Sequence, residues 1–119
     1  MRSKIYSLVF CFSILTALCA VAAPQAFAQD KKQLERAKKL ATEGDEFYRQ
    51  KNYQEAINRY SQAIAIAPNY PYAHFSKGYS HYNLAQYDNA VQDLDTALPQ
   101  GYTPIEIYKI RWLAHSQKK

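Results

Sequence analysis

The sequence repeats itself at a fixed offset, and this feature limits the possible folds most strongly. Residues 52–68 read NYQEAINRYSQAIAIAP, and residues 86–102 read QYDNAVQDLDTALPQGY in the same alignment. The same offset aligns Gly44 with Gly78. A fixed period of this size, about 34 residues, is typical of repeat architectures, in which each unit buries its apolar face against its neighbours.

Apolar residues recur at spacings of three and four throughout the repeat, which indicates helices with one buried face. The predicted helices cover about residues 34–48, 53–67, 71–82, 87–98 and 104–118. Proline ends the second of these helices at Pro68, because its ring does not allow the helix to continue. Thr103 and Pro104 provide an N-cap and a first helical residue for the fifth helix. No segment predicts a strand, so we expect an all-α fold.

Small residues recur inside these helices, although glycine lowers helix stability. Two antiparallel helices approach closely only where glycine and alanine leave room for the large side chains of the neighbour. We therefore predict that Gly44 and Gly78 are contact points between the two helices of each repeat.

At these residues the chain resembles the tetratricopeptide repeat (TPR) family, and specifically a small exported bacterial member of it. The first repeat, about residues 37–70, supplies Leu40, Gly44, Phe47, Ala56, Tyr60, Ala63 and Pro68, and the second, about residues 71–104, supplies Gly78, Ala90, Leu94 and Ala97. The second repeat departs from the family pattern at His74, His81 and Tyr102. The resemblance implies an α-α superhelix, or TPR solenoid, of two helix-turn-helix repeats plus a C-terminal capping helix at about 104–118.

The fifth helix carries Trp112 at the glycine position of a third repeat. A tryptophan there would obstruct a further partner helix. We expect Trp112, Ile105, Tyr108 and Leu113 to lie over the fourth helix instead and to close the end of the stack, as terminal elements of repeat proteins do.

The resemblance also implies a concave groove that binds a peptide or protein segment. Carried onto this chain, the groove positions are Lys38, Ala41, Asp45, Tyr48 and Arg49 in the first repeat, Tyr72, Phe75, Tyr79, Tyr82 and Asn83 in the second, and Lys109 with Glu106 in the capping helix. Aromatic side chains are common anchors in recognition sites. The alternative is that several of these rings only fill the gap between helices.

One binding mode of the family is disfavoured by the sequence. Chaperone adaptors of this fold clamp a C-terminal carboxylate with lysine and asparagine at two positions of the first repeat. This chain has Ala41 and Asp45 at those positions. An apolar, aromatic or basic segment suits the tyrosine-rich walls better.

Catalysis, cofactors and metals are not indicated. His74 and His81 are seven residues apart and share a helix face, but no third ligand or nearby carboxylate is evident at a matching spacing, so we interpret them as packing residues. Asp93 and Asp95 are two residues apart and point in different directions. No glycine-rich phosphate loop occurs, and the charge is too mild to indicate nucleic acid. We predict that the protein is not an enzyme.

Residues 1–28 resemble a signal peptide, with Arg2 and Lys4 before an apolar stretch and Ala26-Phe27-Ala28 at its end. We expect cleavage after Ala28; the alternative is an uncleaved anchor, since the apolar stretch is just long enough to span a bilayer. Both cysteines lie in this leader. Its removal lowers Lys plus Arg from 15 to 13 against 10 Asp plus Glu, a formal charge of +3 instead of +5.

These observations predict a single mature domain, residues 29–119, exported to the periplasm or secreted. We expect an adaptor or assembly subunit of the cell envelope that binds a protein segment in its groove. The alternative is a structural module that forms homo-oligomers through its aromatic surface.

Overall fold

The computed structural model describes residues 27–101 and 105–118, and it divides the chain into two compact units, Met1–Lys32 and Gln33–Lys119. In the first unit the described residues, 27–32, are helical and exposed. The predicted leader, apart from Phe27 and Ala28, lies outside the described residues, and so do Thr103 and Pro104. Within the described ranges, no helix has the length and apolar character needed to cross a bilayer.

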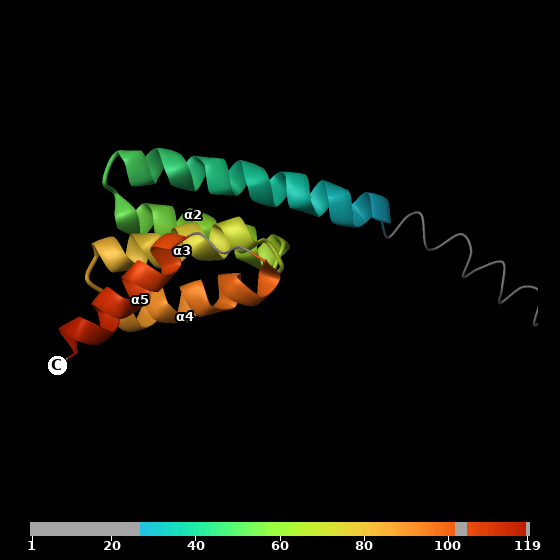
Figure 1. The fold of residues 1–119 in the computed structure, drawn as a ribbon. Coiled ribbons are helices and arrows are strands. Elements are labelled where there is room, and N and C mark those ends of the chain that lie inside the picture. Colours follow the sequence, from blue (N-terminus) through green and yellow to red (C-terminus); the bar gives the residue numbers. More distant parts are fainter. Residues whose placement is uncertain (1–26, 102–104, 119) are drawn as a thin grey trace, which may run out of the picture. The chain divides into compact units, whose positions relative to one another are not determined.

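The second unit is built from helices that follow one another along the chain (Figure 1). Residues 33–49 form a first helix, followed by α2 (Tyr53–Ile66), α3 (Pro71–Asn83), α4 (Tyr87–Ala97), a short 3-10 helix η1 (Leu98–Gln100) and α5 (Ile105–Gln117). Consecutive helices pack on each other, α2 on α3, α3 on α4 and α4 on α5. No residue in the described ranges is in a strand. The predicted all-α fold of repeated helical hairpins is confirmed.

The two hairpins turn in the same way, at positions that are equivalent in the repeat. Lys51 and Ala85 have positive φ, 61° and 58°. In each turn the amide of the following residue donates to the carbonyl oxygen five residues earlier, at 2.9 Å. This is the wider hydrogen bond of a Schellman motif, which usually places glycine at the left-handed residue. A side chain in that conformation costs about 1–2 kcal/mol, so the packing of the helices stabilises these turns.

The glycines lie at the contacts between paired helices. A Cβ atom added to Gly44 would lie 2.6 Å from Cε1 of Tyr60. A Cβ atom added to Gly78 would lie 3.0 Å from Cγ of Leu94 and 3.1 Å from the carbonyl oxygen of Ala90. Tyr60 and Leu94 are themselves equivalent in the repeat, and both are fully buried. The prediction that these glycines are contact points is confirmed.

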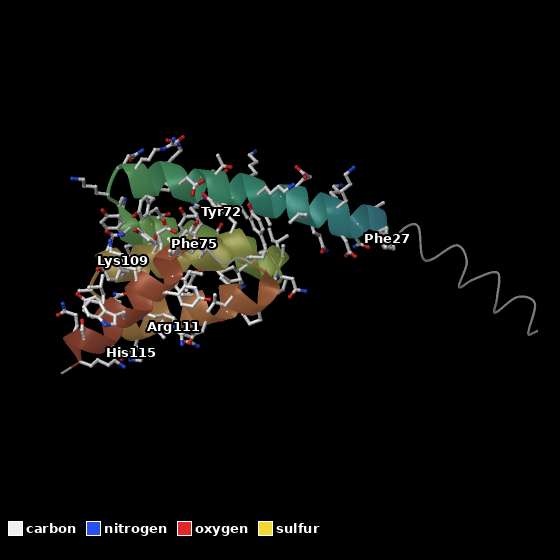
Figure 2. The ribbon with its side chains drawn as sticks, viewed as in Figure 1. Phe27, Tyr72, Phe75, Lys109, Arg111 and His115 are labelled. Atoms are coloured by element: carbon white, nitrogen blue, oxygen red, sulfur yellow. The ribbon has the colours of Figure 1, made fainter. Side chains whose placement is uncertain are left out.

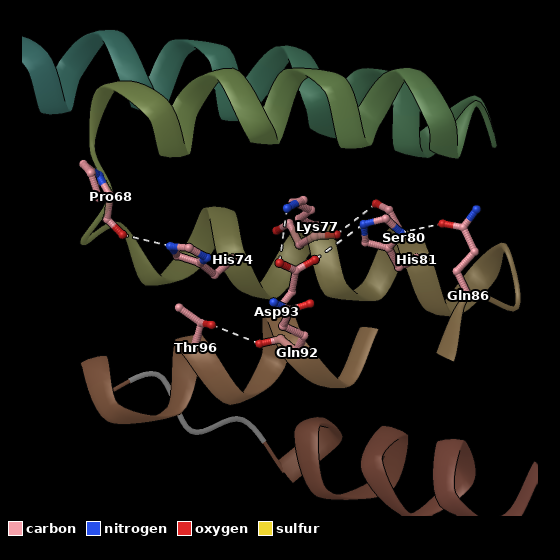
Figure 3. A network of polar contacts seen from close by, with 10 residues as sticks. Pro68, His74, Lys77, Ser80, His81, Gln86, Gln92, Asp93 and Thr96 are labelled. Atoms are coloured by element: carbon pink, nitrogen blue, oxygen red, sulfur yellow. Dashed lines mark hydrogen bonds and ion pairs between the residues drawn. The ribbon is translucent and has the colours of Figure 1, made fainter. Parts of the chain in front are cut away.

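An ion pair also joins the two helices of each repeat, with its charges exchanged between the repeats. Glu43 pairs with Arg59 at 3.1 Å in the first repeat, and Lys77 pairs with Asp93 at 3.2 Å at the equivalent positions of the second (Figure 3). Each pair links the first helix of its hairpin to the second. The exchange preserves the attraction, although neither residue type is repeated.

The last helix packs on α4 as predicted, but with a different face. Ile107, Ile110 and Ala114 are buried, and the first two join Leu94 in a core cluster. The predicted contact residues are exposed: Ile105 by 80%, Tyr108 by 56% and Trp112 by 69%, while Leu113 is half-buried. That part of the prediction is wrong.

The reason lies in the repeat register. One repeat period earlier, Ile107, Ile110 and Ala114 correspond to Ala73, Ser76 and Ser80, which are buried on α3. The helix α5 therefore presents to α4 the side that is also buried in α3. The apolar ridge of Ile105, Tyr108 and Trp112 lies at the positions of Pro71, His74 and Gly78, of which Gly78 faces the second helix of its own repeat.

Candidate functional site

The candidate site is a cavity of about 290 Å³ formed by residues of four helices. Its lining residues are Asp45 and Tyr48 from the first helix, Tyr60 from α2, Tyr72, Phe75, Ser76 and Tyr79 from α3, and Glu106 from α5. Five of the eight side chains are aromatic. Ligand pockets usually measure roughly 300–1,000 Å³, so this cavity is matched to a side chain or a short segment.

Two features bring these residues together: the helical spacing along α3 and the absence of a side chain at Gly44. Tyr72, Phe75 and Tyr79 recur at spacings of three and four, so they lie along one face of α3. Figure 2 labels the first two. Tyr60 belongs to the second helix of the first repeat, and its ring runs closely past Gly44, which has no Cβ atom. Its hydroxyl thereby reaches Asp45, the residue that follows this glycine.

Asp45 is held by two tyrosine hydroxyls. Tyr60 donates to one carboxylate oxygen at 2.7 Å, and Tyr72 donates to the other at 2.9 Å. Burial, reinforced by Asp45, raises the pKa of Tyr60 far above its usual value. The pKa of Tyr72 is raised to about 12, chiefly by burial and also by Asp45, while a hydrogen bond with Ser76 acts in the opposite direction. Both hydroxyls therefore stay protonated, and remain donors, far above neutral pH.

Tyr48 connects the two repeats at the edge of the cavity. Its hydroxyl accepts a hydrogen bond from Nδ2 of Asn83 at 3.0 Å. Its ring meets those of Tyr53 and Tyr79 edge-on, with centroids 5.3 and 6.3 Å apart. Burial raises the pKa of this phenol, and the bond from Asn83 partly offsets the effect. These contacts hold the Tyr48 ring in place on the cavity wall.

The structure brings together only part of the predicted groove. Asp45, Tyr48, Tyr72, Phe75 and Tyr79 line the cavity, together with Glu106, while Asn83 contacts Tyr48 beside it. Tyr82 lies outside the lining, where its ring meets those of Tyr79 and Tyr87. The exposed Lys38, Arg49 and Lys109 also lie outside it. Lys38 pairs with Glu35 and Arg49 with Glu46 on their own helix.

The prediction that Ala41 lines the groove is corrected by the structure. It is only 1% exposed and belongs to the core cluster of the first repeat, with Ala56, Tyr60 and Ala63. A small apolar residue at a helix contact is buried there, so it lines no groove.

Two lining residues, Tyr60 and Ser76, were not predicted. Tyr60 reads from the sequence as a core residue of α2, and its ring is indeed buried, but its hydroxyl reaches Asp45. Only the spacing of Ser76 from Tyr72 and Tyr79, four and three residues away on α3, could have indicated it. The rings also have a packing role, since Tyr48 and Tyr72 lie against one core cluster and Phe75 and Tyr79 against the other.

The two histidines lie on α3, each with polar partners of its own (Figure 3). His74 is buried, and its Nε2 lies 2.8 Å from the carbonyl oxygen of Pro68. Nδ1 of His81 lies 2.6 Å from Gln86, and Nε2 lies 3.5 Å from a carboxylate oxygen of Asp93. The sequence indicated no carboxylate near these histidines; the structure corrects this, because Asp93 lies next to His81. Among the described residues, no three His, Cys, Asp or Glu side chains are grouped to hold a metal ion.

Comparison with known families supports the repeat assignment. Residues 44–85 match the family model described as TPR repeat. Over this segment the chain is similar to a tetratricopeptide repeat. The segment takes in the end of the first helix and all of α2 and α3. Of the described residues that line the cavity, all but Glu106 lie within it.

Three relatives are similar to this chain over part of its length. Over 59 residues the chain is 39% identical to the Hsp70-Hsp90 organising protein of Plasmodium falciparum, an alignment that covers 50% of this chain and 10% of that protein. It is 32% identical over 63 residues to small glutamine-rich tetratricopeptide repeat-containing protein 2 of Saccharomyces cerevisiae, and this alignment covers 53% of this chain and 18% of that protein. It is 29% identical over 82 residues to human sperm-associated antigen 1, and this alignment covers 69% of this chain and 9% of that protein.

The chain therefore spans less than a fifth of each of these eukaryotic relatives. The similarity to them extends over 59 to 82 residues of this chain. Tetratricopeptide repeats are a non-catalytic fold that generally mediates protein–protein interactions, and the cavity lies largely within residues 44–85.

Proposed function

We propose that the protein is an adaptor or assembly subunit that captures a segment of another protein at the aromatic cavity. The observation that carries this proposal is the composition of the cavity, in which rings from both repeats stand beside carboxylates from the first helix and α5. Tyrosine combines a broad apolar surface with a polar tip and loses little conformational entropy when it is fixed. A protein segment with one anchoring side chain fits such a site.

The carboxylates make a C-terminal carboxylate a poor ligand for this cavity. Asp45 and Glu106 would repel an acidic group, and Ala41 is buried in the core. We therefore propose that this chain binds a different class of segment from an acidic tail.

The proposal places this function outside the cytoplasm. The support is the sequence of residues 1–28, with its basic start, apolar stretch and small residues at positions 26 and 28. N-terminal sequencing of the protein purified from its native cells should find a chain that starts at Gln29. A chain that starts at Met1 in a membrane fraction would favour the anchored alternative.

The binding proposal is tested by site-specific photo-crosslinking. A benzoylphenylalanine at position 79 should crosslink to one protein segment in living cells, and the same group at position 87 should not. Tyr79 lines the cavity, whereas Tyr87 is a half-buried tyrosine outside it. The crosslinked segment, identified by mass spectrometry and synthesised, should bind the wild-type protein in calorimetry. Tyr79→Leu should weaken that binding by at least about tenfold, since buried aromatic anchors are worth about 2 kcal/mol or more.

Tyr87→Leu is the matched control, because it removes a tyrosine without changing the cavity lining. Circular dichroism should show unchanged helix content in both variants. Equal binding by the wild type and the Tyr79→Leu variant would refute the assigned site.

Self-association is a second candidate, favoured by the exposed ridge of α5. Ile105, Tyr108 and Trp112 follow the 3-4 spacing by which identical helices pair. A two-fold contact needs only one such patch on each copy. Because Trp112 is the only tryptophan, its fluorescence should shift to the blue with rising concentration while light scattering reports a dimer. A constant monomer mass would refute this candidate.

A further inference from the structure

The cavity carries negative charge in a protein that is otherwise basic. The chain has a formal charge of +5, yet the described residues that line the cavity include two carboxylates, Asp45 and Glu106, and no lysine or arginine. Lys109 lies one turn after Glu106 but is exposed and is not part of the lining. A cleft lined with charge of one sign attracts ligands of the opposite sign.

The carboxylates of Asp45 and Glu106 can accept hydrogen bonds from a further donor. Each oxygen of Asp45 accepts one tyrosine hydroxyl, and a carboxylate oxygen has two acceptor sites. Glu106 is exposed and forms no ion pair within residues 27–101 and 105–118. An ammonium or guanidinium group of a ligand can therefore be received without breaking an existing ion pair of the protein.

The aromatic walls suit the same kind of ligand. Cations bind over the faces of tyrosine and phenylalanine rings, and Tyr48, Phe75 and Tyr79 line this cavity. The chain already contains this combination elsewhere. The guanidinium carbon of Arg59 lies 5.7 Å from the centroid of the Phe47 ring, while the same group pairs with Glu43.

We propose that the cavity receives the cationic side chain of a lysine or arginine carried by the bound segment. Asp45 and Glu106 supply the negative charge, and the rings of Tyr48, Phe75 and Tyr79 supply the faces. This inference rests on the proposed function, because it names the class of segment that the adaptor selects.

The test uses capped tripeptides of the form acetyl-Gly-X-Gly-amide, in which X is lysine, arginine, glutamine, leucine or glutamate. Binding is followed by nitrogen–proton NMR at the amides of Ser76 and Tyr79. The lysine and arginine peptides should shift these signals with dissociation constants roughly threefold to thirtyfold below that of the glutamine peptide, the sum of a cation–π contact and an exposed ion pair. The glutamate peptide should bind most weakly, and added salt should reduce the preference.

A pair of charge-neutralising variants locates the effect. Glu106→Gln should weaken the lysine peptide by up to about fivefold, the range of one exposed ion pair, and should leave the leucine peptide unchanged. Glu46→Gln removes the same charge next to Asp45 but outside the lining, and should change neither peptide.

The outcomes separate the two proposals. If the glutamine or leucine peptide binds as tightly as the lysine peptide at these amides, the preference for a cation is refuted while the cavity remains a binding site. If no tripeptide shifts them, the cavity does not receive single side chains and this inference fails. Photo-crosslinking at position 79 still decides the proposed function independently.

Discussion

Replacing Gly44 by alanine has two opposing effects on stability, a gain in helix propensity and a steric cost at Tyr60. Alanine favours a helix over glycine by about 1 kcal/mol, so propensity alone predicts a more stable protein. The new methyl carbon, however, would lie 2.6 Å from Cε1 of Tyr60, whereas ordinary contacts begin at 3.4 Å. The structure must therefore absorb a shift of about 0.8 Å, the difference between these two distances.

Tyr60 has little freedom to give way. Its side chain is 1% exposed, and its hydroxyl is bonded to Asp45 at 2.7 Å. Overpacking of a well-packed core costs typically about 1–3 kcal/mol, and this constrained ring places Gly44→Ala near the upper end. We therefore expect a net loss of about 1–2 kcal/mol in the free energy of unfolding, the overpacking cost less the gain in propensity.

The measurement is urea unfolding followed by far-UV circular dichroism. In a parallel thermal melt of a domain of this size, each kcal/mol lost from the free energy of unfolding should lower the melting temperature by roughly 4–8 °C. Gly78→Ala is the matched control, because its nearest contacts of 3.0–3.2 Å need much smaller adjustments. Its penalty should nearly cancel its gain in propensity. In a Tyr60→Leu background, which removes the ring, the penalty of Gly44→Ala should shrink. A Gly44→Ala variant more stable than the wild type would refute the reasoning.

Three further predictions concern stability. Ile110→Ala should destabilise the protein by about 2–5 kcal/mol, because it leaves a hole in the core, while Trp112→Ser should change stability by less than about 0.5 kcal/mol in the same urea experiment, since that side chain is exposed. Ala85→Gly should stabilise by up to about 1 kcal/mol in thermal melts, because relief of positive φ outweighs the added entropy of the unfolded chain. Raising the pH from 10.0 to about 12 should reduce stability, because the unfolded state loses the phenolic proton of Tyr72 while the folded state retains it; Tyr72→Phe should flatten this slope in unfolding experiments at stepwise pH.

The sequence was informative where a residue's role depends on its own helix or hairpin. The repeat period and the 3-4 spacing predicted the helices, the breaks and the close contacts at Gly44 and Gly78. These features depend on backbone preference and on the size of one side chain, both of which can be read locally.

The sequence was less informative for α5. Two apolar stripes run along this helix, one with Ile107 and Ile110 and another with Tyr108 and Trp112. The placement of Trp112 at the glycine position of a third repeat favoured the aromatic stripe, but the inter-repeat register buries the aliphatic one. Composition within one helix does not indicate which neighbouring surface is available.

The sequence by itself determined that this chain forms paired helices that recur at a fixed period, and that small residues lie where the pairs meet. Only the tertiary structure decided that Tyr60 and Tyr72 hold Asp45, that Glu106 joins the same cavity, and that Lys38, Arg49 and Lys109 do not. The physical reason is that helix periodicity is a local property, whereas a cavity depends on distances between side chains from different helices. Those distances are set by the angles at which the helices pack.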